Sequence, residues 1–406
     1  MMPQARSLQT ILIHFSPWSR LAVTALSHTV EHLYVGIITV VLPAMATALG
    51  LTMAQAGLLV SARSLVAGIS NIPAGLLADL TSRRSLILGL SLLLLGLSSF
   101  LMSFASNFWT LILLMAVGGI GAGSFHPQSL SILSTFYRDR RALALGVHDS
   151  AGNLGEVLAP LTIGTLLTYL DWRGALQLWA IPGMAVGLFY ALCCGEAGIA
   201  DRKQIRLKRS LWKDVLINRA VFGMFLISVF RTMGQTALLA FLPLYLTLER
   251  KLSMGAMGAY ISLLFLFAGL APSLSGWLSD RLGRKPLMIT GSALSALFIA
   301  SLPYLDSGVS LFVGCALVGT TLWALRPIIF AAAMEAAPPE LAGSLVGFIF
   351  SGNMGLSFLA PILAGVIADA YNLASALIFI GVFPLLACLV ALSSLVAKQP
   401  QSAPIP

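Results

Sequence analysis

Three residues near the start of the chain have the types and spacing to do chemistry. In the stretch SHTVEHLYVG, His28, Glu31 and His32 form the pattern H-x-x-E-H. On a helix, this pattern places two imidazole ligands and a carboxylate base around the zinc ion of a metallohydrolase. The same groups could instead bind and release protons, because histidine titrates near neutral pH and burial can bring a carboxyl group there. The rest of the chain decides between these two interpretations.

The composition is that of a chain built to lie in a membrane. Of its 406 residues, 58% are hydrophobic and only 10% are charged, a combination outside the usual range of soluble domains. Apolar segments long enough to cross a hydrocarbon core of about 30 Å recur along the chain, and each can satisfy its own backbone as a helix. The sequence predicts an all-α membrane protein with twelve transmembrane helices. They are expected at residues 21–46, 53–79, 85–105, 108–136, 142–170, 174–198, 219–247, 254–279, 286–304, 308–336, 342–369 and 374–397.

The net charge of +9 would suit a nucleic-acid-binding protein, but the positions of the basic residues do not. With the N-terminus placed inside, the outer loops carry only Arg173, Arg250 and Lys251, and the other basic residues between helices lie on the inner side. Basic residues concentrate on the cytoplasmic side of membrane proteins. We therefore expect a multi-pass protein of the inner (plasma) membrane with both termini in the cytoplasm and no nucleic-acid partner.

The sequence repeats itself with a period of about two hundred residues. GLLADLTSRR begins at Gly75 and GWLSDRLGRK at Gly276, while GNLGEVLAPLTIG begins at Gly152 and GNMGLSFLAPILAG at Gly352. A parallel duplication with a site between the two halves is typical of secondary transporters. It predicts two pseudo-symmetric six-helix bundles, residues 1–198 and 219–406, joined by the basic cytoplasmic linker 199–218.

The repeated glycine–aspartate–basic segment resembles the best-known motif of the major facilitator superfamily, and the resemblance extends over nearly the full length of the chain. It implies the major facilitator fold and a transporter that works by alternating access, without enzymatic activity or cofactors. The glycines allow close helix contact, and an aspartate can face a helix N-terminus across the interface. We also expect the protein to work as a monomer on a small-molecule substrate. The resemblance assigns gating to Gly75, Asp79, Arg83, Arg84, Gly276, Asp280 and Arg284.

Two narrower resemblances concern the direction of transport. LSHTVEHLYVG, SFHPQS and GNLGEVLAP together resemble the fosmidomycin-resistance group of drug exporters. Gly146, Gly155, Pro160 and Gly164 are similar to the superfamily's antiporter motif on the fifth helix. Both imply export in exchange for protons, although Met115 stands where many proton antiporters carry an arginine on the fourth helix. No G-x-x-x-x-G-K-[ST] loop occurs, so ATP is not expected to drive the protein directly.

Titratable residues inside the predicted helices are few, and each is a candidate for function because a charge in the bilayer is costly. The central acids all lie in the first half, whereas the second half contributes arginines. Acids and histidines can carry protons, and an arginine can hold a phosphonate or carboxylate with two hydrogen bonds. Proton coupling is assigned to Glu31, Glu156, His126 and Asp149. Substrate binding is assigned to His28, His32, Arg63, His126, Asn153, Arg231, Gln235, Arg326 and Asn353.

Alternatives remain for these charges. The repeat places Arg231 at the position equivalent to Glu31. Glu31 and Arg231, or Glu156 and Arg63, could therefore form ion pairs that serve the structure rather than transport. The zinc pattern is short and lies in a duplicated transporter frame, so no metal is expected. The sequence predicts a proton-coupled secondary transporter that exports a small organic anion or drug-like compound. Proton-coupled uptake of an organic anion and an intramembrane zinc hydrolase are the alternatives.

Overall fold

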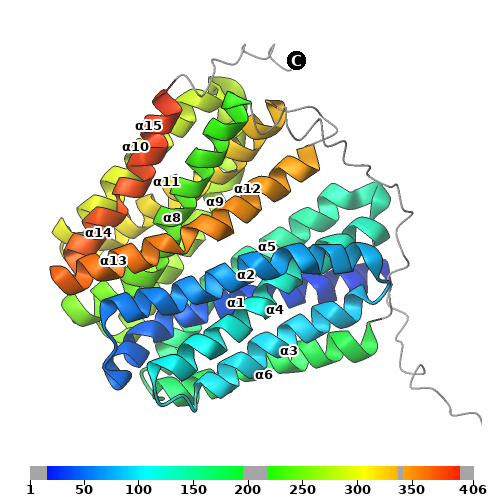
Figure 1. The fold of residues 1–406 in the computed structure, drawn as a ribbon, viewed down its shortest axis with the longest axis horizontal. Helices are drawn as coiled ribbons and strands as arrows, with labels where there is room; N and C mark the ends of the chain where they lie inside the picture. Colours follow the sequence, from blue (N-terminus) through cyan, green and yellow to red (C-terminus); the bar gives the residue numbers. More distant parts are fainter. Residues whose placement is uncertain (1–15, 195–217, 337–341, 394–406) are drawn as a thin grey trace, which may run out of the picture.

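The computed structural model describes residues 16–194, 218–336 and 342–393, and these are almost entirely helical (Figure 1). The first bundle contains α1 to α6, and the short turn η2 (Arg138–Arg140) precedes α5. The bounds are α1 (Pro17–Leu49), α2 (Met53–Leu80), α3 (Arg84–Met102), α4 (Phe108–Phe136), α5 (Arg141–Leu166) and α6 (Trp172–Cys193). The predicted linker 199–218 falls almost wholly outside the described residues.

The second bundle contains α8 to α15, with the π-helical turn η3 (Tyr245–Glu249) continuing α8 and the short turn η4 (Leu302–Tyr304) following α10. The bounds are α8 (Arg219–Leu244), α9 (Met254–Leu282), α10 (Arg284–Ser301), α11 (Val309–Glu335), α12 (Ala342–Ser357), α13 (Leu359–Ala370), α14 (Leu373–Ile380) and α15 (Val382–Leu392). Among the described residues, eleven helical stretches are long and apolar enough to cross a membrane. The twelfth long helix is α5, which contains Asp149 and Glu156. The predicted all-α fold with twelve membrane helices in two bundles is confirmed.

Two of the predicted spans, 342–369 and 374–397, are each divided into two helices. Pro361 has no N–H to donate to the carbonyl of Ser357, and its ring crowds that carbonyl. The helix is accordingly interrupted at Phe358, between α12 and α13. Pro384 stands in the same relation to Ile380, the last residue of α14. Pro73 and Pro127 are accommodated inside the continuous helices α2 and α4, so the residue type alone does not predict where a span divides.

The two bundles contact each other at one end of the molecule. We call the end where α1 ends and α2 begins the outer end, and the opposite end the inner end. A Cβ added to Gly164 of α5 would lie 2.8 Å from the carbonyl oxygen of Met254 in α9, and one added to Gly365 of α13 would lie 2.5 Å from that of Met53 in α2. Small residues let these backbones touch directly. The outer end is therefore closed.

Toward the inner end the same helices separate. A Cβ added to Gly75 of α2, Gly146 of α5, Gly276 of α9 or Gly355 of α12 would meet nothing within 4 Å. In Figure 1 the bundles approach each other near α13 and splay apart toward the far ends of α2, α5 and α12. The conformation is closed at the outer end and open at the inner end.

A carboxylate bridges the two bundles at the closed end. Asp369, in the last turn of α13, accepts hydrogen bonds from the backbone N–H groups of Met53 at 2.7 Å and Ala54 at 2.8 Å. These N–H groups belong to the first turn of α2, where they have no helical partner and where the helix dipole favours negative charge. Asp369 thus holds the outer ends of α2 and α13 together. It is absent from the predicted site residues, because its role depends on a contact between distant segments.

Candidate functional site

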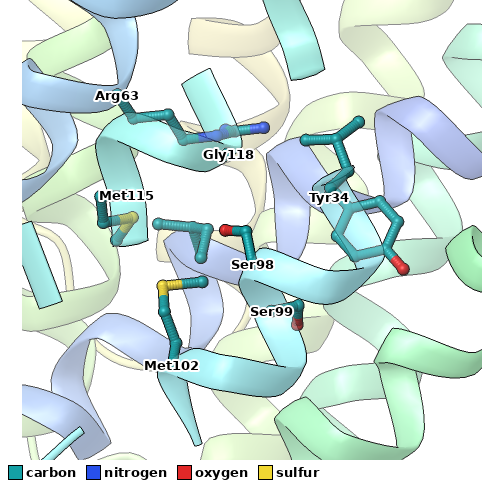
Figure 2. A pocket seen from close by; sticks show the side chains of 9 residues that line it. Tyr34, Arg63, Ser98, Ser99, Met102, Met115 and Gly118 are labelled. Carbon is teal, nitrogen blue, oxygen red and sulfur yellow. The ribbon is translucent and has the colours of Figure 1, made fainter. Parts of the chain in front are cut away.

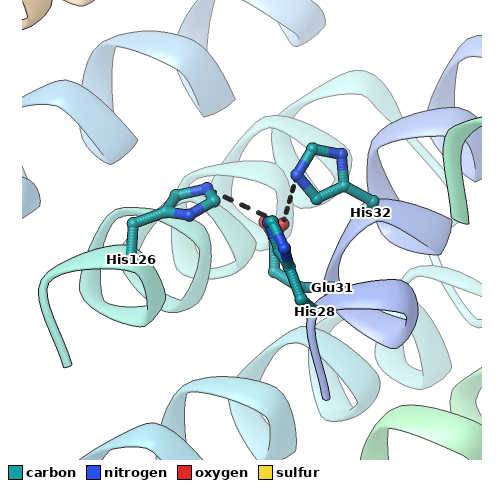
Figure 3. Close-up of side chains that lie close together, drawn as sticks. All are labelled: His28, Glu31, His32 and His126. Atoms are coloured by element: carbon teal, nitrogen blue, oxygen red, sulfur yellow. Dashed lines mark ion pairs between the residues drawn. The ribbon is translucent and has the colours of Figure 1, made fainter. Parts of the chain in front are cut away.

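The predicted chemistry of α1 gathers at one place inside the first bundle (Figure 3). His28, Glu31 and His32 share a face of α1, as their helical spacing predicts, and His126 reaches the same place from α4. The Glu31 carboxylate oxygen Oε2 lies 3.6 Å from Nε2 of His32 and 3.8 Å from Nε2 of His126. One acid is therefore flanked by two imidazoles from different helices.

Helix α5 fixes the orientation of the two α1 histidines. Nδ1 of His28 lies 2.7 Å from the backbone carbonyl of His148, and the two rings stack with centroids 3.9 Å apart. Nδ1 of His32 lies 3.0 Å from Oε1 of Glu156. Gly152 makes this approach possible, because a Cβ there would lie 2.6 Å from Cε1 of His28. The position of a glycine on α5 thus decides how the α1 imidazoles are held.

The cluster is buried on the side of α1 and partly exposed on the side of His126. His28 is 4% exposed and Glu31 is 2% exposed, whereas the side chain of His126 is 39% exposed. Nε2 of His28 and Oε2 of Glu31 are buried without a hydrogen-bond partner among the described residues. Buried polar atoms without a partner are costly. The arrangement therefore favours binding of a proton or an ion that reaches the cluster past His126.

The second bundle presents positive charge and amide groups. Arg231 of α8 donates from Nη1 to Oε1 of Gln235 at 2.7 Å and from Nη2 to Oγ1 of Thr232 at 3.1 Å. On α12, Asn353 donates to Oγ of Ser228 at 3.0 Å. These contacts orient the polar groups of α8 and α12 toward each other, within one bundle.

Arg326 connects the two bundles electrostatically. It is exposed on α11, and its charge acts on Arg231 in its own bundle. It also acts on His32 and His126 in the first bundle. Within the described part of the chain, the charge of Arg326 therefore acts on residues of both halves.

The two ion pairs that the sequence left open, Glu31–Arg231 and Glu156–Arg63, are not formed among the described residues in this conformation. Glu31 faces His32 and His126, whereas Nη1 and Nη2 of Arg231 bind Gln235 and Thr232 on its own helix. Glu156 pairs with His32. The internal repeat makes Glu31 and Arg231 equivalent within their respective bundles. Equivalence of that kind does not bring two residues into contact.

Arg63 points into a small pocket inside the first bundle (Figure 2). Its Nη2 is buried without a hydrogen-bond partner among the described residues, and the charge of Glu31 acts on it. Met115 lines the same pocket from α4. It holds the position at which the resemblance to proton antiporters expects an arginine, so here α2 supplies a guanidinium to that region. The pocket is lined by Tyr34, Ile38, Arg63, Leu95, Ser98, Ser99, Met102, Met115 and Gly118.

Asp149 and Asn153 lie on α5 beyond the buried cluster. Asp149 is exposed, and its charge acts on His126. Cβ of Asn153 lies 3.5 Å from the place of a Cβ added to Gly269 on α9, so Asn153 stands at the boundary between the bundles. His148 completes the α5 face through its ring and carbonyl, although it is absent from the predicted site residues. The available signal was that His148 is a titratable residue inside the predicted helix 142–170.

The contacts described for the predicted gating residues are those of Arg84, Asp280 and Arg284, and they lie within each bundle. Arg84 is buried and donates to the carbonyl of Ala78 at 2.6 Å and to Oγ1 of Thr135 at 3.1 Å. Arg284 pairs with Asp280 at 2.6 Å and with Glu335 at 3.1 Å. Arg83 is exposed, and a Cβ added to Gly75 or Gly276 would meet nothing within 4 Å. The side chain of Asp79 lies outside the described part of the chain.

Comparison with known proteins agrees with this architecture. The family model of the Major Facilitator Superfamily matches residues 24–361 and 224–406. The chain is 26% identical over 355 residues to a "Probable L-galactonate transporter" of Escherichia coli, covering 79% of this chain and 76% of the relative. It is 24% identical over 340 residues to the "Multidrug resistance protein MdtG" of Escherichia fergusonii, covering 82% and 81%.

A solved structure shares the fold as well. It is a bacterial homologue of the human lysosomal transporter Spinster, in an inward-facing and unoccupied conformation. The TM-score is 0.79 at 18% identity, over 92% of this chain and 96% of that one. The protein is therefore a multi-pass membrane transporter rather than an enzyme, and the chain belongs to the Major Facilitator Superfamily.

Proposed function

We propose that the protein is a proton-coupled secondary transporter that exports a small organic anion or drug-like compound in exchange for protons. One observation carries the proposal: the buried acid Glu31 lies among histidines in the first bundle, and the exposed Arg326 of the second bundle acts on two of those histidines. A group that holds a proton and a group that holds an anion are thus electrostatically linked. Glu156 and Asp149 are the further candidates for carrying protons.

The proposed substrate site lies between the bundles. Arg326 is exposed, and Nε of Arg231 is buried without a hydrogen-bond partner among the described residues. Guanidinium groups suit carboxylate and phosphonate groups. The L-galactonate relative is named for the transport of an organic acid, which supports an anionic substrate. We propose that the binding residues are His28, His32, Arg63, His126, Asn153, Arg231, Gln235, Arg326 and Asn353.

Export is supported by two lines of resemblance. The antiporter-like glycines of α5 include Gly164, which packs against Met254 of α9 across the bundle interface. The motifs similar to fosmidomycin-resistance exporters, together with the multidrug-resistance relative, point in the same direction. Proton-driven uptake would use the same residues with the opposite sense of coupling. We further propose that the protein works as a monomer in the inner membrane. Its termini are proposed to lie in the cytoplasm, because most basic residues between the helices lie on the same side as the termini.

Alternating access would exchange the closed and open ends. The glycine contacts between α5 and α9 and between α2 and α13 would open, and the inner segments containing Gly75 to Arg84 and Gly276 to Arg284 would come together. Asp79, Arg83 and Asp280 are then candidates for contacts across the closed inner gate. The present contacts of Arg84 with Ala78 and of Arg284 with Asp280, each within one bundle, suit a state in which that gate is open.

Asp369→Ala should increase opening of the outer end about thirtyfold, the factor that corresponds to roughly 2 kcal/mol. The variant removes two charge-assisted hydrogen bonds across the interface, each contributing roughly 1 kcal/mol at an exposed site. The reporter is Ser61→Cys, since Ser61 is buried and donates to the carbonyl of Phe358 across the same interface. Labelling by a membrane-impermeant thiol reagent is measured after the four native cysteines are replaced with serine.

Glu249→Ala is the matched control for this experiment. Its carboxylate accepts hydrogen bonds from the N–H groups of Leu373 and Ala374 at the start of α14, but within one bundle. It should therefore leave labelling of the reporter unchanged. Equal labelling in Asp369→Ala and in the parent protein would show that the Asp369 contact does not hold the outer end closed.

The proposed function is tested in proteoliposomes with an imposed pH gradient. Organic anions and drug-like compounds are screened for the ability to dissipate the gradient through the purified protein. Export by exchange requires that substrate and proton fluxes run in opposite directions, whereas uptake requires that they run together. A panel in which no compound moves protons would contradict proton coupling.

A further inference from the structure

We propose that His28, Glu31, His32 and His126 form a binding site for a divalent transition-metal ion of the Zn²⁺ type. Each residue offers one ligand atom, and the four atoms lie within 4.8 Å of one another (Figure 3). Three imidazoles and one carboxylate are a complete ligand set for zinc, which prefers four ligands in tetrahedral geometry. The proposal concerns binding and is independent of the zinc hydrolase already set aside.

The hydrogen bonds around the cluster fix which ring nitrogen carries the hydrogen and which is free to bind a metal ion. A carbonyl can only accept, so the 2.7 Å contact with the His148 carbonyl requires that Nδ1 of His28 carry the hydrogen. In the neutral ring Nε2 then has a free lone pair, and this atom is buried without a hydrogen-bond partner among the described residues. Metal-binding histidines typically donate their second N–H to a carbonyl or carboxylate in this way.

His32 has the same arrangement with a carboxylate. Its Nδ1 lies 3.0 Å from Oε1 of Glu156, which leaves Nε2 directed toward Glu31. His28 and His32 are four residues apart on α1, a spacing that places two ligands on one helix face. Oε2 of Glu31, which lies near Nε2 of both His32 and His126, likewise has no hydrogen-bond partner in the described part of the chain. An ion would supply the partner that both buried atoms lack.

The geometry needs only a small contraction and has an entry path. Ligands at about 2.0 Å from a tetrahedral ion lie roughly 3.3 Å apart, so side-chain rotations must draw the four atoms in by up to about 1.5 Å. His126, 39% exposed, is the side from which an ion would enter. Imidazole donors favour zinc and similar metals over Mg²⁺ and Ca²⁺, which prefer oxygen ligands.

Charged residues around the cluster determine how tightly it is expected to bind a metal ion. Glu31 and Glu156 are the acids of the cluster, and the charge of Asp149 reaches His126. Against them stand the positive charges of Arg63, which interacts electrostatically with Glu31, and of Arg326, which acts on His32 and His126. Removing the positive charge at Arg326 should therefore tighten metal binding, whereas removing a ligand should weaken it. Opposite signs from these two changes distinguish this site from an ion bound elsewhere.

The test is calorimetric titration of the full-length chain with Zn²⁺ in detergent, free of a histidine tag and stripped with a chelator. We expect one ion per chain, no competition by excess Mg²⁺ or Ca²⁺, and the visible absorption of tetrahedral cobalt when Co²⁺ replaces Zn²⁺. His28→Ala and His126→Ala should each weaken binding by at least the roughly 10–100-fold that loss of an outer-shell partner costs. Should His28→Ala fail to fold, as judged by elution and thermal unfolding, the partly exposed His126 provides the same test.

Asp149→Asn and Arg326→Ala are the controls. Asp149 is an acid close to the cluster that contributes no ligand atom, so its variant should change affinity by less than about threefold, roughly the effect of a single exposed charge. Arg326→Ala should bind Zn²⁺ more tightly than the parent protein. Absence of binding, or equal affinity in the parent, His28→Ala and His126→Ala, would overturn the proposal. Because the titration involves no transport, it succeeds or fails independently of the proposed function.

Discussion

Glu31→Gln should reduce gradient-driven transport to the level of protein-free liposomes while leaving exchange of labelled for unlabelled substrate intact. Glutamine keeps the size of the side chain but cannot take up and release a proton. Glu31 is 2% exposed and faces two imidazoles from different helices, so its charge state affects the whole cluster. Loss of coupling with preserved exchange would separate the proton step from movement of the substrate.

Asp306→Asn is the matched control for the Glu31 variant. Asp306 is an exposed acid in the outer connection before α11, and the described contact there uses its backbone carbonyl rather than its carboxylate. This variant should retain full gradient-driven transport. Concentrative transport in Glu31→Gln at the level of the Asp306→Asn control would remove Glu31 from the coupling step and make Glu156 the next residue to test.

The transmembrane architecture could be predicted from local properties of the sequence. Length and hydrophobicity of each segment suffice for a helix that satisfies its own backbone in lipid, and the repeat of the Gly75 and Gly276 segments predicts two bundles. The division of α12 from α13 could not be predicted. Pro127 is accommodated inside the continuous α4, whereas the helix before Pro361 is interrupted. Which outcome occurs depends on packing around each proline.

The sequence predicted which site residues of α1 share a helix face, but it did not predict how neighbouring helices orient their side chains. His28, Glu31 and His32 share a face because of their spacing on α1. The orientation of their rings depends on α5, through the carbonyl of His148 and the close approach at Gly152. Neither contact has a signal in the sequence of α1. The internal repeat predicts equivalent positions in the two bundles but carries no information about which residues meet.

Arg326→Lys should weaken the apparent affinity for an anionic substrate about tenfold, the effect of roughly 1.5 kcal/mol from a lost charge-assisted hydrogen bond. Lysine keeps the positive charge but lacks the planar guanidinium group that binds an anion with two parallel hydrogen bonds. Arg326 is exposed on α11, whereas two nitrogens of Arg231 are already bound to Gln235 and Thr232. Of the two, Arg326 is therefore better placed to hold the substrate.

The alternative task for Arg326 is to balance the charge of the cluster in the first bundle, since its own charge acts on His32 and His126. In that case lysine should suffice for normal affinity, and Arg326→Ala should change the pH dependence of transport instead. Titrating transport against substrate concentration and against pH in both variants distinguishes the two tasks. Arg173→Lys is the control, because Arg173 lies near the outer end of the first bundle, stacked on Trp172 and bound to the carbonyl of Ser103. Parental affinity and pH profile in Arg326→Ala would assign neither task to Arg326 and leave substrate recognition to Arg231 and the amides of Gln235 and Asn353.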